Sequence, residues 1–316
     1  LELLPAKSNR MDANNWTRAS VIMEKPLRRW TNEKDDAPIP PESVIDLTAR
    51  ITSDGHLEWD VPKGEWVIVR TGHRMTGSKT MLALPGTEGL SIDWLSRRGV
   101  DSQFRHLGEP ILEASKPYVG TTLVYFCDDS FEDGFPNWTE DILGRFRQYR
   151  GYDPVPYLGV LAGYIVGSAE ISDRFLHDYR KTVADCMADE HYGRFAELCH
   201  ANGLKVQNEA AGPSRSGTMC MDGLKNLGRS DFPMGEFWLG TEYGGENEEN
   251  ASLGYGKTRL EDGQNKVTKM TASAAHIYGR RLASAEAFTS FRPHWIDTPH
   301  TLKYAADRAF CEGINR

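Results

Sequence analysis

Four apolar runs of the sequence end close to glutamates, and this is the pattern with the clearest chemical content. The glutamates are Glu132, Glu209, Glu236 and Glu286. In a fold of alternating strands and helices, the carboxyl ends of the strands meet on one face, where such residues are typical of catalysis. Burying an unpaired carboxylate costs several kcal/mol or shifts its pKa. A single one of these glutamates could be a salt-bridged structural residue, but four converging positions favour a functional site.

Aromatic residues follow the acids closely along the chain. They are Phe131, Trp138, Phe237, Trp238, Phe288, Phe291 and Trp295. Flat apolar side chains beside carboxylates suit sugar rings, whose C–H faces pack on aromatics while their hydroxyls bind polar groups. Phe131 and Phe288 are expected to belong to the core instead. Hydrolysis of a glycoside needs one protonated and one ionised carboxyl group, and neighbouring acids push their pKa values apart in the required way.

The elements that must position these residues alternate between strand and helix. Strands are predicted over 121–127, 204–206, 232–237 and 282–285, and helices over 139–150, 168–202, 266–278 and from 298 onward. This alternation predicts a parallel sheet or barrel. No G-x-G-x-x-G or Walker loop is present, which disfavours an open dinucleotide-binding sheet. We therefore expect an α/β fold of the (β/α)8 TIM-like barrel type, truncated at its C-terminal end.

Three regions are expected along the chain. Residues 1–42 are polar and rich in proline and predict an arm or linker. Residues 43–71 predict a small β-rich lead-in with strands over 43–51, 57–61 and 65–70. Residues 72–316 predict the incomplete barrel, with a glycine-rich polar excursion over 240–265. The ends of the chain indicate a piece of a longer protein with flanking domains.

Composition excludes several other classes of protein. The formal net charge of −8 in 316 residues argues against nucleic-acid binding. The longest nearly apolar stretch, 157–167, is too short to span a membrane. The five cysteines form no Cys-x-x-Cys pair, and no Gly-x-Ser-x-Gly, His-Glu-x-x-His or EF-hand motif occurs, which leaves zinc, serine-hydrolase and sequential calcium motifs without support.

The order of several segments resembles the α-L-rhamnosidases of glycoside hydrolase family 106. The segments are 127–153, 166–205, 231–238 and 271–290, preceded by 54–77. The resemblance extends over roughly residues 43 to 316. It implies an inverting exo-hydrolase that removes terminal α-L-rhamnosyl residues from polysaccharides or glycosides, with a calcium-assisted site and a secreted or periplasmic location.

The resemblance also implies roles for individual residues. Glu132 corresponds to a general acid and Glu286 to a general base, although these two labels could be exchanged. Glu236 corresponds to a third pocket glutamate that could hold substrate or metal. Residues expected to bind substrate are Asp129, Trp138, Asn208, Glu209, Trp238, His294 and Trp295. Calcium rests on the resemblance alone, and its ligands are not assigned.

Two other functions are compatible with the sequence. One is a carbohydrate-binding relative without catalytic activity. The other is a glycosidase of the same fold that acts on a different sugar, because a fold does not select its substrate.

Overall fold

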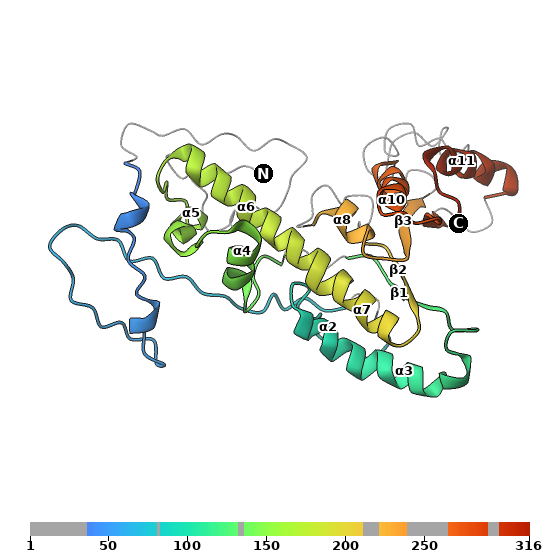
Figure 1. Ribbon diagram of the computed structural model, residues 1–316, viewed down its shortest axis with the longest axis horizontal. Helices are drawn as coiled ribbons and strands as arrows, with labels where there is room; N and C mark the ends of the chain where they lie inside the picture. Colours follow the sequence, from blue (N-terminus) through green and yellow to red (C-terminus); the bar gives the residue numbers. More distant parts are fainter. Residues whose placement is uncertain (1–36, 81–82, 132–135, 211–220, 239–264, 290–296) are drawn as a thin grey trace. The chain divides into compact units, whose positions relative to one another are not determined.

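The computed structural model describes residues 37–80, 83–131, 136–210, 221–238, 265–289 and 297–316 (Figure 1). The chain divides into two compact units. Unit 1 comprises Leu1–Thr76 and Asn137–Val183, and unit 2 comprises Gly77–Pro136 and Ala184–Arg316. No helix in the described part of the chain is long and apolar enough to cross a membrane.

Unit 2 contains a parallel sheet of four strands in the order β1-β2-β3-β4. The strands are β1 (Tyr125–Asp128), β2 (Lys205–Asn208), β3 (Phe232–Trp238) and β4 (Ser284–Thr289). Each pairs with the next in parallel orientation. The prediction of an α/β fold with a parallel sheet is therefore confirmed. A closed (β/α)8 barrel stays a prediction, with which four sequential parallel strands are compatible.

The helical elements of unit 2 contact the sheet or one another. They are α2 (Arg97–Gln103), η3 (Phe104–Gly108), α3 (Glu109–Ala114), η4 (Lys116–Tyr118), η6 (Met187–Gly193), α7 (Arg194–Ala201), α8 (Gly223–Leu227), α10 (Asn265–Ile277) and α11 (Pro299–Glu312). Val206 of β2 is buried against Ala196 and Cys199 of α7. Figure 1 shows α10 beside β3.

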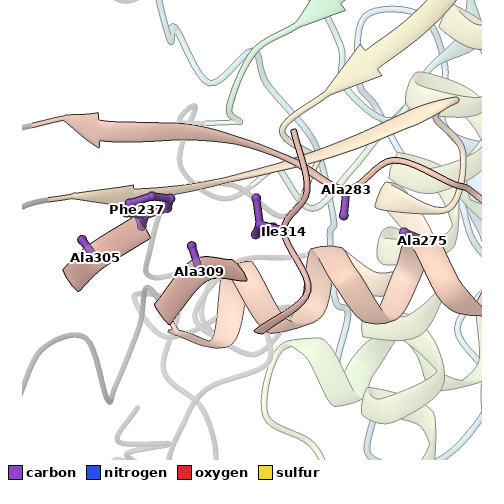
Figure 2. Close-up of a cluster of buried hydrophobic side chains, with 6 residues drawn as sticks. All are labelled: Phe237, Ala275, Ala283, Ala305, Ala309 and Ile314. Atoms are coloured by element: carbon purple, nitrogen blue, oxygen red, sulfur yellow. The ribbon is translucent and has the colours of Figure 1, made fainter. Parts of the chain in front are cut away.

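An apolar cluster distinct from the contacts around Val206 lies between the β3–β4 pair and the last two helices, α10 and α11. Its buried members are Phe237, Ala275, Ala283, Ala305, Ala309 and Ile314 (Figure 2). Small alanine side chains let α10 and α11 approach the strands closely, and Phe237 fills the space between them. Because successive side chains of a strand point to opposite faces, Val206 and Phe237 define the helix-facing side. Strand residues one or three positions before or after them point to the other side.

The regular secondary structure in the described part of unit 1 is helical. Its elements are η1 (Pro41–Ser43), η2 (Thr48–Arg50), α4 (Ile142–Arg150), η5 (Val155–Tyr157), α5 (Leu158–Leu161) and α6 (Ala169–Cys186), the last of which ends in unit 2. Gly151 ends α4 with φ 80°, the left-handed conformation that glycine adopts at little cost. Phe146 of α4 and Phe175 of α6 pack with their ring centroids 5.6 Å apart.

The helices agree closely with those predicted, whereas some strands differ. The helix predicted over 168–202 is present as α6, η6 and α7, and Ser168 accepts a hydrogen bond from the Ile171 amide, as expected of an N-cap. The strand predicted from 121 begins at Tyr125. No strand is present over 43–71; an isolated bridge joins Ile51 to Leu57. Extended segments there find no neighbouring strand, and a strand without a partner leaves its backbone groups unpaired.

Candidate active site

Three carboxylates from the strands β1, β2 and β4 or the residues that follow them lie together in unit 2. Asp129 follows β1, Glu209 follows β2 and Glu286 lies on β4, and one oxygen of each lies within 4.8 Å of the other two. Glu209 is 1% exposed, whereas Asp129 and Glu286 are accessible to solvent. The prediction that the strand ends would converge is supported by these positions.

Glu236 belongs to the same group of acids. Its Cα is the register partner of Glu286 across the β3–β4 pair, so the two side chains leave the sheet on the same side. Glu236 is 4% exposed. A Cβ at the neighbouring residue Gly235 would point to the helix-facing side, where Thr271 of α10 lies close to it. We call Asp129, Glu209, Glu236 and Glu286 the acidic cluster, and the side of the sheet that carries it the acidic face.

The acidic cluster changes the ionisation of its most buried member. The pKa of Glu209 is raised from 4.5 to about 9, first by burial and then by the negative charges of Glu236, Glu286 and Asp129. Neither Glu209 oxygen accepts a hydrogen bond from a donor among the described residues. A hydrogen bond that protonated Glu209 donates to the Asp129 carboxylate favours the protonated form further. Without a cation, Glu209 is therefore neutral at pH 7.

A β-bulge shapes the end of β4. Phe237 is paired with Ala287 and Trp238 with Thr289, so Phe288 is an extra residue between the two pairs. Its φ of 65° makes it a left-handed residue that is not glycine. The Phe288 ring packs edge-on against Phe237, with centroids 5.1 Å apart. This contact places Phe288 on the helix-facing side, although strict alternation from Glu286 would place it on the acidic face.

The acidic cluster fits a calcium ion. Oxygens bound to Ca²⁺ lie about 2.4 Å from the ion, so two ligands are at most about 4.8 Å apart. The oxygens of Asp129, Glu209 and Glu286 meet this limit. A hard oxygen-only donor set is the kind that Ca²⁺ prefers, and the unbonded buried oxygens of Glu209 are of the type that a cation satisfies.

The other residues expected in the site are distributed as follows. Asn208 is the register partner of Asp128; it is fully buried, and its side-chain amide has no hydrogen-bond partner in the described part of the chain. Trp238 is the last residue of β3. Trp138 lies in unit 1, stacked on His73 with ring centroids 5.9 Å apart. Glu132, His294 and Trp295 lie outside the described residues.

Sequence reasoning missed one buried polar residue near the acidic cluster. His191 is 2% exposed, and its Nε2 lies 2.9 Å from Oδ2 of Asp128. It belongs to η6, a π-helical turn within the long helical run. The helical spacing of apolar residues conceals this turn, because one extra residue per turn has no sequence signature. No local pattern could have revealed the contact, because His191 and Asp128 are 63 residues apart in the sequence.

Comparison with known proteins identifies the family. The profile of a family described as alpha-L-rhamnosidase, glycoside hydrolase family 106, matches residues 7–316. A solved structure titled as a rhamnosidase from Novosphingobium sp. PP1Y is similar with a TM-score of 0.77 and 31% sequence identity, over 95% of this chain and 28% of that one.

A curated relative bears a different name. A Formosa agariphila protein named "Putative beta-glucuronidase" is 40% identical over 282 residues, which is 89% of this chain and 22% of the relative. The chain thus spans less than a third of the length of either protein. The match over nearly all of its length shows that the chain belongs to the glycoside hydrolase family 106 α-L-rhamnosidases.

Proposed function

We propose that the protein hydrolyses terminal α-L-rhamnosyl residues of polysaccharides or glycosides with inversion at the anomeric carbon. The observation that carries this proposal is the convergence of Asp129, Glu209 and Glu286 from three strands, with Glu236 in register beside Glu286. Several carboxyl groups with different environments on one face supply both a proton donor and a proton acceptor.

The proposed roles follow from ionisation and position. Glu286 acts as the general base, which takes a proton from the attacking water. Glu132, at the end of the segment that follows β1, acts as the general acid that protonates the leaving oxygen. Glu209 carries its own proton in the absence of a cation; it then donates a hydrogen bond instead of adding negative charge. Glu236 binds sugar hydroxyls.

Calcium is part of the proposal as a bound cofactor. Asp129 and Glu209 would hold the ion, close to Glu286. When bound, Ca²⁺ supplies positive charge that orients sugar hydroxyls and offsets the repulsion among the carboxylates. Binding would also displace the proton of Glu209, because carboxylate ligands bind the metal in their ionised form.

A β-glucuronidase activity is the second candidate, because the Formosa agariphila relative bears that name. A glucuronide carries a carboxylate, and the acidic face would repel it unless cations were supplied. A neutral deoxy sugar meets no such penalty. The electrostatics of the acidic cluster therefore favour rhamnose.

The test compares aryl α-L-rhamnosides with aryl β-glucuronides and a panel of other aryl glycosides, using the full-length protein. We expect rhamnoside hydrolysis with inversion of configuration, and Glu286→Gln and Glu132→Gln each to lower kcat by about 10²-fold or more. Turnover of the glucuronide alone would replace rhamnose with the second candidate. Sugar binding without turnover of any glycoside would identify a carbohydrate-binding relative.

A further inference from the structure

Two adjacent aspartates leave the end of β1 toward opposite sides. Asp129 belongs to the acidic cluster. Asp128 is the register partner of Asn208, whose neighbour Glu209 is on the acidic face, so Asp128 points to the helix-facing side. A carboxylate that turns away from the other acids needs a partner on that side.

His191 is this partner. Its Nε2 lies 2.9 Å from Oδ2 of Asp128, and the side chains of His191 and Asp128 are 3% and 18% exposed. Nδ1 of His191 is buried and has no hydrogen-bond partner among the residues that the structure describes. Since an ionised carboxylate can only accept hydrogen bonds, Nε2 of His191 carries a hydrogen and donates a hydrogen bond to Asp128.

Trp94 connects His191 to the residues that follow Asp129. The Trp94 ring lies against His191 with centroids 4.1 Å apart, and edge-on against Phe131 with centroids 4.9 Å apart. Phe131 is fully buried. The segment Asp128–Phe131 is thus held at both ends, by a hydrogen bond at its start and by ring packing at its finish.

We propose that His191 is a positioning residue for the reaction, a role that rests on the proposed function. It holds Asp128 on the helix-facing side, and thereby turns Asp129 toward Glu209 and Glu286. It also fixes the start of the segment Asp128–Phe131. Without the imidazole, the end of β1 loses the hydrogen bond that anchors Asp128, and the adjacent Asp129 is no longer held in place in the acidic cluster.

The position of His191 in the fold suits this role. The imidazole comes from η6, a π-helical turn of seven residues, Met187–Gly193. Such turns change which side chains face the neighbouring layer and are frequent at functional sites. A residue needed only to fill the core would be apolar here, because the unbonded Nδ1 costs free energy that packing does not return.

The test uses two variants of similar volume in the full-length protein. In His191→Gln, the side-chain amide can still donate to Asp128; in His191→Met it cannot. We expect His191→Met to lower kcat by about tenfold or more with little change in KM, because a misplacement of about 1 Å slows chemistry without removing the binding surface. We expect His191→Gln to restore most of kcat. Equal kcat values in the two variants and the wild type would overturn the proposal.

Crystal structures of the same two variants give a readout that is independent of activity. We expect the Asp129 carboxylate to move away from Glu209 by about 1 Å or more in His191→Met and to stay in place in His191→Gln. An unmoved Asp129 in His191→Met overturns the positioning role whatever the sugar. If the protein hydrolyses a different glycoside, the proposed function is refuted but the positioning role of His191 is not. The kcat values of the two variants are then compared on that glycoside.

Discussion

The hydroxyl of Thr289 lies 2.6 Å from Oε1 of Glu286, although the two residues are three apart on one strand. In a regular strand, residues three apart point to opposite faces of the sheet. The extra residue Phe288 removes this opposition and brings Thr289 to the side of Glu286. Holding Phe288 in the left-handed region costs about 1–2 kcal/mol, which its packing against Phe237 offsets. The bulge thus gives the proposed base a hydrogen-bond donor.

Removal of the Thr289 hydroxyl should weaken catalysis. A hydrogen bond to a charged group contributes about 1.5–3 kcal/mol, so Thr289→Val should lower kcat/KM by about 10- to 100-fold. Thr289→Ser keeps the donor and should stay within a few-fold of the wild type. Steady-state kinetics of both variants provides the check. If valine and serine at this position give the same kcat/KM, the hydroxyl has no role in holding Glu286.

Gly235 should tolerate no side chain. A Cβ at this position would lie 2.5 Å from Oγ1 of Thr271 and 2.9 Å from Cγ1 of Val267. Gly235→Ala should therefore lower the free energy of unfolding by about 1–3 kcal/mol and reduce activity, because β3 must shift together with Glu236. Gly89→Ala is the control, since nothing lies within 4 Å of a Cβ there. Denaturant unfolding of both variants measures the difference; equal stabilities would contradict the close packing of β3 on α10.

Stability of the metal-free protein should fall as pH rises. The folded state holds the Glu209 proton up to a pKa of about 9, whereas the unfolded chain loses it near 4.5. Between these values the folded state binds more protons, so each rise of one pH unit should cost up to about 1.4 kcal/mol. The stabilising contribution of the neutral carboxyl is complete below about pH 4.5 and is lost by about pH 9.

Glu209→Gln isolates this effect, because a neutral amide of the same shape removes the titration. Thermal unfolding at pH 5, 7 and 9 in excess chelator should show a midpoint that falls with pH in the wild type and falls less steeply in the variant. Parallel curves for the two proteins would show that Glu209 does not retain its proton.

Calcium should stabilise the protein through the acidic cluster. We expect millimolar Ca²⁺ to raise the thermal midpoint, with a larger rise at pH 8 than at pH 5, because the ion must displace the Glu209 proton. Asp129→Asn should reduce the rise and weaken calcium binding in calorimetry. Glu42→Gln, which changes an exposed acid of unit 1, is the control. A rise that is unchanged in Asp129→Asn would place the ion elsewhere.

The elements that the sequence predicts best are those defined by local signals. Ser168 and Gly151 mark helix ends by capping preferences that operate within one turn, and both ends are where the sequence predicts them. Strands over 43–71 were predicted from strand-like runs separated by turn residues. Such runs indicate a preference for extended backbone, but a strand also needs a neighbour, which a local pattern does not supply.

The acidic cluster could be predicted in part. That strand-end acids converge follows from parallel topology, so Glu209, Glu236 and Glu286 could be found from their places after apolar runs. The contact of Asp128 with His191 could not, because it joins residues 63 apart through a π-helical turn. The bulge at Phe288 was equally hidden, since glycine or asparagine is the usual signal for a left-handed residue.

The pairing of Glu236 with Glu286 has a practical consequence for engineering. Two acids in register on adjacent strands, next to a buried third, oppose folding, and neutral residues at these positions would relieve the repulsion. A thermostability screen that does not measure turnover would therefore enrich substitutions within the acidic cluster. Libraries built on this scaffold should hold these four positions constant.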